Sequence, residues 1–180
     1  MLLSDTWLKP STPSRLVTIP GYTLTRVDRP DCRGYGGVAA LIKVGIAAAS
    51  LKVPIDRVPE SKLEALWMLV KLEGGGRQLI IGSLYRHPRH TASAIEADFT
   101  DLEAQVERLT ISHPKGTIII CGDLNCDMLK DPPSLARFRL EEFLHVYSLH
   151  QIVKSPTYSS GSLLDVCIVK KCEDVAGVKN

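Results

Sequence analysis

A carboxylate and an amide follow a strongly apolar segment in the middle of the chain. The segment reads Thr117-Ile-Ile-Ile-Cys-Gly-Asp-Leu-Asn125, so Asp123 and Asn125 stand two residues apart just after a run of isoleucines. On an extended backbone two such side chains emerge from the same face, and Gly122 allows another group to approach closely. The pattern therefore presents a carboxylate and an amide to one ligand. The alternative interpretation is a strand end with an Asx turn.

Two further segments combine an apolar run with polar side chains. Ile80-Ile-Gly-Ser-Leu-Tyr-Arg-His-Pro88 ends in Tyr85, whose phenol can donate a hydrogen bond, and Arg86, whose guanidinium suits a phosphate. Taken alone, this ending is also that of a polar turn. Near the start of the chain, Asp5 interrupts the apolar stretch Leu2-Leu-Ser-Asp-Thr-Trp-Leu8 beside a tryptophan. An N-cap or a salt bridge is the alternative role for this acid.

A further acid lies in the last apolar segment of the chain. Within Pro156-Thr-Tyr-Ser-Ser-Gly-Ser-Leu-Leu-Asp-Val-Cys-Ile-Val169, Asp165 interrupts a run that is otherwise typical of a strand. Burying a lone carboxylate is costly unless it is paired or hydrogen-bonded. Asp165 is therefore a candidate site residue.

Short apolar runs rich in β-branched residues alternate with two helical patterns, which predicts a mixed α/β fold. Five runs have the composition of strands, over residues 37–43, 44–51, 78–85, 117–121 and 163–170. A first helix is predicted over 92–109, where apolar residues recur at spacings of three and four and Ser93 with Glu96 forms a capping box. A second helix is predicted over 134–147, with Pro133 suited to its first turn.

One apolar segment, residues 63–72, fits either a helix or a buried strand by periodicity. The three glycines at 74–76 that follow it favour a tight hairpin connection. They do not favour a phosphate-binding loop, because no Lys-Ser/Thr pair follows them.

The composition predicts a single folded domain over 1–180, with residues 171–180 as a tail. The chain is 44% hydrophobic and 23% charged, and its net charge of +2 is too small to indicate a nucleic-acid-binding protein by itself. No apolar run approaches the roughly 18 to 20 residues of a membrane span, and the N-terminus lacks the basic segment of a signal peptide. We therefore expect an intracellular protein, nuclear or cytoplasmic, that is neither secreted nor membrane-bound.

The five cysteines do not follow the spacing of common zinc sites. Four residues separate Cys121 from Cys126 and Cys167 from Cys172, where two are usual. We interpret the cysteines as reduced, mostly buried thiols.

Taken together and in this order, these segments resemble the endonuclease/exonuclease/phosphatase superfamily, and most closely the endonuclease domains of non-LTR (LINE-type) retrotransposons. That family has Ser-Glu-Thr-Trp-Leu, a Gly-Gly-Val strand like Gly36-Gly37-Val38, then Tyr-Arg-Pro-Pro, Gly-Asp-Phe-Asn, a Thr followed by Leu-Asp, and a closing Ser-Asp-His. The match runs from about Leu3 to Val169. It implies a two-layer β-sandwich flanked by helices, the deoxyribonuclease-like α/β fold, and Mg²⁺-dependent hydrolysis of phosphodiester bonds in DNA.

The resemblance also implies roles for individual residues. Asp123 matches the acid that orients and activates the attacking water, and Asn125 matches the amide that binds the scissile phosphate. Tyr85 matches a phosphate-contacting tyrosine, Thr157 a threonine on the DNA-contacting loop, and Asp165 the acid that orients the catalytic histidine. Asp5 stands at the position of the metal-binding glutamate, which implies Mg²⁺ or Mn²⁺ as cofactor. Its carboxylate reaches about 1.5 Å less far than that of a glutamate, so we expect weak binding.

Two motifs of that family lie outside the match. The family's first strand, which carries an asparagine that supports the site, would precede residue 1. The closing Ser-Asp-His would follow Val169, yet residues 170–180 contain no Asp-His pair. We therefore expect a partial domain, truncated at both ends, with weak or absent hydrolysis and with exposed sheet edges through which copies associate. His87 and His90 are the alternative sources of the missing histidine.

The implied function is that of a retrotransposon-derived DNA endonuclease, with DNA as the partner and no membrane. Two alternatives remain open at this point. One is a non-catalytic nucleic-acid-binding or interaction module. The other is a phosphatase or phosphodiesterase of the same superfamily, because a fold does not determine its substrate.

Overall fold

The computed structural model describes residues 1–29, 35–56, 58–72 and 77–170. In these residues the chain forms two β-sheets, two α-helices and a short 3-10 helix, Ser14–Leu16. The strands are β1 (Leu2–Ser4), β2 (Tyr22–Val27), β3 (Val38–Lys43), β4 (Ala48–Leu51), β5 (Glu64–Lys71), β6 (Gln78–Tyr85), β7 (Gly116–Asp123), β8 (Leu149–Gln151) and β9 (Asp165–Lys170). The helices are α1 (Ala92–Ser112) and α2 (Leu135–Val146).

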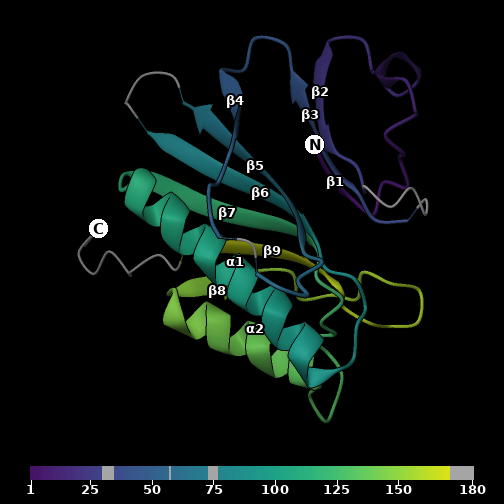
Figure 1. Ribbon diagram of the computed structural model, residues 1–180, viewed down its shortest axis with the longest axis vertical. Coiled ribbons are helices and arrows are strands. Elements are labelled where there is room, and N and C mark those ends of the chain that lie inside the picture. Colours follow the sequence, from purple (N-terminus) through teal and green to yellow (C-terminus); the bar gives the residue numbers. More distant parts are fainter. Residues whose placement is uncertain (30–34, 57, 73–76, 171–180) are drawn as a thin grey trace, which may run out of the picture.

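The larger sheet has six strands in the order β4-β5-β6-β7-β9-β8 (Figure 1). Its neighbours pair antiparallel except β6 and β7, which run parallel and are connected through α1. Parallel neighbours require such a crossover, because the chain must return to the same end of the sheet before the second strand begins. The smaller sheet has the order β1-β3-β2, and both of its pairs are antiparallel.

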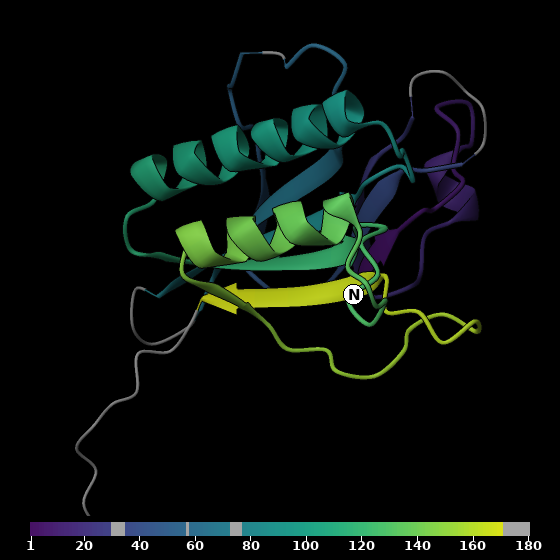
Figure 2. The ribbon, with the colours of Figure 1, turned by 90° about the horizontal axis from the view of Figure 1, so that it is seen from below.

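The helices and the smaller sheet cover opposite faces of the six-stranded sheet. Figure 2 shows α1 and α2 side by side on one face. The larger core lies between that face and the helices, and its members include Trp67, Leu84, Phe99, Ile120 and Phe143. A smaller core lies between the two sheets and consists of Val38, Ala40, Leu66, Met68 and Tyr85. The predicted sandwich with helices on its outside is therefore confirmed.

The segment 63–72, which periodicity left ambiguous, forms strand β5 between β4 and β6. Trp67 faces the helices, where its Nε1 donates a hydrogen bond to Gln105 Oε1 at 2.7 Å. Leu66 and Met68 point to the opposite side and join the core between the sheets. Both faces of β5 are thus apolar, so its sequence lacks the alternation that would distinguish a strand from a helix.

Most predicted strands are confirmed, with shifts at their ends. The runs at 37–43, 78–85 and 117–121 form β3, β6 and β7, and the run at 163–170 forms β9, which begins two residues later than predicted. The strand predicted over 44–51 was too long, because the chain turns at Gly45, where φ is +95°, and pairing begins only at Ala48. Strands β1, β2 and β8 were not predicted. β1 and β8 have three residues each, too few for a periodic pattern.

Helix α1 is confirmed and extends to Ser112. The capping box expected from Ser93 and Glu96 is wrong, because the N-cap residue is Thr91 and no side chain makes a capping hydrogen bond there. The apolar face of the helix, rather than its cap, therefore determines where it docks. In the described part of the chain, no helix is long and apolar enough to cross a membrane.

Helix α2 is also confirmed, with a different start. Its N-cap is Ser134, whose hydroxyl accepts a hydrogen bond from the backbone N–H of Arg137 at 3.2 Å. Pro133 therefore precedes the cap and does not lie in the first turn. The glycine connection at 74–76 and the tail at 171–180 lie outside the described residues.

Candidate functional site

Four polar side chains form one row across the six-stranded sheet. Glu64 on β5 is in register with Tyr85 on β6, Tyr85 with Asp123 on β7, and Asp123 with Asp165 on β9. Neighbouring strands lie about 4.8 Å apart, and residues in register point to the same face. The structure thus brings together three of the predicted site residues, Tyr85, Asp123 and Asp165. Glu64 is a fourth member that the sequence did not indicate.

Strand β1 of the smaller sheet adds Asp5 to this row. β1 lies over β6 and β7, and the Ser83 hydroxyl on β6 donates a hydrogen bond to Leu3 O at 2.9 Å. Asp5 follows the end of β1 directly. Its Oδ1 accepts a hydrogen bond from the N–H of Gly36, and the next N–H, that of Gly37, donates to Glu64 Oε2, so Asp5 lies beside the row. The acid predicted as a metal ligand therefore reaches the same site.

Asp123 is a carboxyl group whose protonated form is favoured by its surroundings. Burial raises its pKa above the ordinary value, and the charges of Asp165 and Asp5 raise it further. The backbone N–H of Asn125 donates to Asp123 Oδ1 at 2.9 Å, and this bond, with the charge of Arg86, opposes the increase. The net effect is a raised pKa, which suits a group that accepts a proton during a reaction.

Tyr85 is held as a neutral phenol at the centre of the row. Burial and the charges of Asp5, Asp123 and Glu64 raise its pKa to about 12. The phenol is therefore protonated at neutral pH and can donate a hydrogen bond to an anionic ligand. Tyr85 itself is 5% exposed, so only a small part of the side chain is open to such a ligand.

Asn125 does not continue the strand, and the Asx turn considered from the sequence is what forms. β7 ends at Asp123, and Asn125 has a φ of +49°, in the left-handed region. Its Nδ2 donates to Arg86 O at 2.7 Å. Gly122 does permit a close approach, but the approaching group is the neighbouring backbone, because a Cβ there would lie 1.9 Å from Leu84 O.

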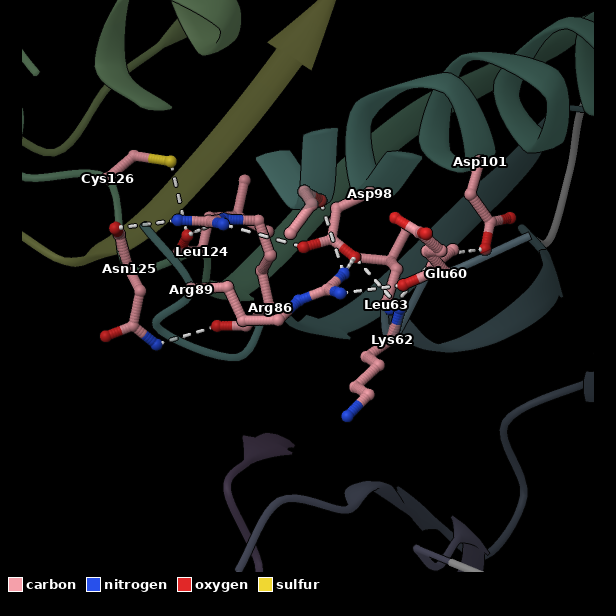
Figure 3. A network of polar contacts seen from close by, with 12 residues as sticks. Glu60, Lys62, Leu63, Arg86, Arg89, Asp98, Asp101, Leu124, Asn125 and Cys126 are labelled. Atoms are coloured by element: carbon pink, nitrogen blue, oxygen red, sulfur yellow. Dashed lines mark hydrogen bonds and ion pairs between the residues drawn. The ribbon is translucent and has the colours of Figure 1, made fainter. Parts of the chain in front are cut away.

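Arg86 lies under the site instead of facing a phosphate. It is 2% exposed, its Nε donates to Leu124 O at 2.7 Å, and its Nη2 donates to Asn125 O at 3.1 Å (Figure 3). Its Nη1 lies 3.5 Å from Asp98 Oδ2. This guanidinium was predicted as a phosphate ligand, but it donates its hydrogen bonds to the loop that carries Asn125. Arg86 therefore positions that loop.

Asp98 is the buried acid that holds this network together. It lies on α1 with a side-chain exposure of 0%, and its Oδ1 accepts hydrogen bonds from the N–H of Lys62, at 2.9 Å, and from Arg89 (Figure 3). Asp98 was not predicted from the sequence as a residue of the site. The sequence does contain a signal for it: this acid lies on the apolar face of the predicted helix, three residues after Ile95. Two arginines precede it in the chain.

Asp165 and Thr157 meet at the other end of the row. The Thr157 hydroxyl accepts hydrogen bonds from the N–H groups of Leu164, at 3.0 Å, and Asp165, at 3.1 Å. The loop predicted to contact DNA is thus tied to the start of β9. The expectation that Asp165 is buried is wrong, because it is exposed at the first residue of the strand. Its ionised form therefore needs no partner.

Asp5 is engaged with the protein through both carboxylate oxygens. Oδ1 accepts a hydrogen bond from the N–H of Gly36 at 2.6 Å, and Oδ2 accepts one from Trp7 Nε1 at 2.9 Å. Each of these oxygens already serves one protein donor and keeps one further lone pair for a metal ion. Among the described residues, no group of three or more His, Cys, Asp or Glu side chains is arranged to hold a metal ion. As placed, these residues do not fit the implied Mg²⁺ or Mn²⁺.

Among the described residues, neither of the two histidines considered as substitutes makes a hydrogen bond or an ion pair with Asp165. Burial and the positive charges of Arg29, Lys62 and Arg89 lower the pKa of His87, and its ring lies 5.5 Å from that of Tyr35. His90 lines a separate cavity of about 300 Å³ beside Asn125. Neither imidazole is positioned by the acid at the start of β9.

Three cysteines lie in the described residues, and all three carry free thiols; Cys32 and Cys172 lie outside that part of the chain. Cys121 meets Cys167 and not the neighbouring Cys126, with 3.6 Å between the two sulfur atoms. Cys121 and Cys167 are in register on β7 and β9, and the Cys167 carbonyl accepts its hydrogen bond from Ile152 on the other side. The two cysteines therefore form a non-hydrogen-bonded antiparallel pair, in which Cα atoms are about 4.5 Å apart.

A scan against protein-family models gives no match, and a search of curated proteins gives none either. Solved structures do match. AP endonuclease LMAP from Leishmania major has a TM-score of 0.68 at 15% identity, over 94% of this chain and 69% of that chain. The human Nocturnin catalytic domain with bound sulfate has a TM-score of 0.67 at 17% identity, over 94% of this chain and 68% of that chain. The endonuclease domain of TRAS1, a telomere-specific non-LTR retrotransposon, has a TM-score of 0.62 at 15% identity, over 85% of this chain and 67% of that chain. All three are endonuclease/exonuclease/phosphatase proteins, and at these identities the likeness shows the fold.

Proposed function

Since the chain has the fold of the endonuclease/exonuclease/phosphatase superfamily, we propose that its site binds the phosphodiester backbone of DNA and hydrolyses it slowly. The observation that carries this proposal is the row of Tyr85, Asp123 and Asp165 on three neighbouring strands, with Asn125 beside it. Hydrolysis of a phosphodiester requires an oriented water and donors that hold the phosphate oxygens.

The proposed roles follow from the chemistry of each side chain. Asp123 orients the attacking water and takes its proton, and its raised pKa brings the group closer to the range of a useful base. Tyr85 remains protonated and donates to a phosphate oxygen. The amide nitrogen of Asn125 has a second hydrogen besides the one given to Arg86 O, and this hydrogen is its donor to the phosphate.

Two features explain why we expect the reaction to be slow. Asp5, Glu64, Asp123 and Asp165 place four carboxylates around the site; Glu64 is paired with Arg29, and unpaired ionised carboxylates repel a phosphodiester. The cofactor implied by the resemblance is Mg²⁺ or Mn²⁺, which would neutralise this charge. Both oxygens of Asp5 are shared with protein donors, and among the described residues no group of three or more such ligands is arranged to hold a metal ion, so we expect little affinity for it.

Plasmid nicking tests the proposal. The purified chain should convert supercoiled plasmid to the nicked form in Mg²⁺ at a rate barely above that of a variant with both Asp123→Ala and Asn125→Ala. Asp101→Ala is the matched control, because it removes an acid on α1 outside the site. Rapid nicking that Asp123→Ala abolishes would contradict the slow reaction. Absence of any DNA binding, measured by anisotropy of a labelled oligonucleotide, would overturn the function.

A non-catalytic nucleic-acid-binding module is the second candidate. It is favoured by the engagement of both Asp5 oxygens with Gly36 and Trp7, while Asn125 is partly exposed and keeps a second amide hydrogen for a phosphate. In this case the chain binds DNA, and its nicking rate equals that of the doubly substituted variant at all Mg²⁺ and Mn²⁺ concentrations.

A further inference from the structure

Trp7 is a large aromatic side chain that is exposed and yet held in one orientation. It is 63% exposed, its Nε1 donates to Asp5 Oδ2 at 2.9 Å, and its backbone N–H donates to Gly36 O at 2.9 Å. The backbone of Trp7 is in the left-handed region, with φ at +59°. The single donor of the indole is thus committed to the protein. What Trp7 offers to a ligand is therefore the apolar face of its ring.

The ring lies at the border of the candidate site. Trp7 is bonded to Asp5, whose other oxygen accepts the N–H of Gly36, and the next N–H, that of Gly37, donates to Glu64 in the row. A ligand whose phosphate reaches Tyr85 therefore comes close to the indole.

We propose that Trp7 is a stacking platform for an unpaired nucleobase, an inference that rests on the proposed binding of nucleic acid at the neighbouring site. A nucleotide combines a phosphate with a flat aromatic ring, which are the two groups that this surface accommodates. In an intact duplex both faces of each base are covered by its neighbours, so only an unpaired or unstacked base can lie on the indole. The inferred ligand is a single-stranded segment or a frayed end.

The chain contains two tryptophans, which makes this inference directly measurable. Trp67 is 2% exposed and is bonded to Gln105 inside the core, so a ligand added to the folded protein changes the emission of Trp7. Titration with a single strand of thymidines should quench this emission. An abasic strand of equal length, which has the same phosphates and no bases, should quench this emission far less. A blunt duplex should also quench it far less than the thymidine strand.

Substitutions separate stacking from other roles of the residue. Trp7→Ala should weaken binding of the labelled thymidine strand by about 5- to 100-fold, the range for loss of one stacked base. Trp7→Phe retains a ring but loses the bond to Asp5, and it should retain most of the affinity. Phe138→Ala is the matched control, because Phe138 is 58% exposed on the outer helix α2. Urea unfolding of each variant verifies that it is folded.

The possible results distinguish this inference from the function on which it rests. If the wild type binds no strand by anisotropy, the nucleic-acid function itself fails. If it binds the thymidine and abasic strands equally, or if Trp7→Ala and Trp7→Phe lose equal affinity, the function stands and stacking is overturned. A shift of Trp7 emission with protein concentration, without DNA, would mean that the ring packs against a second copy of the chain and would also overturn stacking.

Discussion

Asp98 is the residue whose removal tests the buried network under the candidate site most directly. Its side chain is 0% exposed and faces two arginines, Arg86 at 3% and Arg89 at 16% side-chain exposure. It also accepts the backbone N–H of Lys62 at 2.9 Å. In Asp98→Ala both guanidinium groups lose the carboxylate that balances their charge. Arg86 is the more affected of the two, because it is the more deeply buried.

The size of the effect follows from this burial. Breaking a buried ion pair by removing one partner costs about 3–5 kcal/mol, because the charge that remains is uncompensated. For a chain of this size, each kcal/mol corresponds to about 2–4 °C in Tm, so Tm should fall by about 6–20 °C. Asp98→Asn retains an acceptor for the Lys62 N–H and should lose less than Asp98→Ala.

Urea unfolding followed by far-ultraviolet circular dichroism measures these differences as shifts in the midpoint. Asp101→Ala is the matched control, because Asp101 lies three residues further along α1 and its carboxylate is bonded to Ser61 and Gln105 in a partly exposed position. It should cost about 1 kcal/mol. Equal losses for Asp98→Ala and Asp101→Ala would refute the reasoning, since they would mean that the two arginines do not depend on Asp98 for compensation.

Three other substitutions or treatments have defined outcomes. Gly122→Ala should cost roughly 3 kcal/mol or more by urea unfolding, because φ is +143° and the new Cβ would lie 1.9 Å from Leu84 O; a loss below about 1 kcal/mol would contradict the close packing of β6 on β7. Asp123 has a higher pKa in the folded protein than in the unfolded chain, so the folded state is destabilised when this carboxyl loses its proton. The wild type therefore loses stability as the pH rises from the ordinary pKa of an aspartate to the raised pKa. The Tm advantage of Asp123→Asn should therefore grow between about pH 3 and about pH 7 in calorimetry, and a constant difference would contradict the burial of the charge. Peroxide should oxidise Cys121 and Cys167 to a disulfide, with their two hydrogens leaving as water, and should stabilise the fold by about 2–4 kcal/mol. Because the pKa of Cys121 is raised to about 12, the reaction should accelerate as pH rises; peptide mapping that finds no 121–167 bridge after prolonged treatment at high pH would refute the assigned pairing.

The sequence determined the local structure and the residues that interrupt it. Repeating apolar positions marked both helices, and β-branched runs marked β3, β6 and β7, because these patterns depend on neighbours within a few residues. Tyr85 and Asp123 were identified because each is a polar group at the end of an apolar run, and Asp165 because it interrupts such a run. Strand ends at one edge of a sheet lie close together, and the register of β6, β7 and β9 places these three in one row.

Only the tertiary structure decided how each of these groups is used. Arg86 had the chemistry of a phosphate ligand, but its guanidinium reaches Leu124 O, 38 residues away, and is buried there. Asp5 had the chemistry of a metal ligand, but the N–H of Gly36, 31 residues away, occupies one of its oxygens. Burial and hydrogen-bond partners depend on which segments the two sheets bring together, and those contacts join residues far apart in the chain. Local patterns carry no information about such contacts, so the same carboxylate or guanidinium can face a ligand or the protein itself.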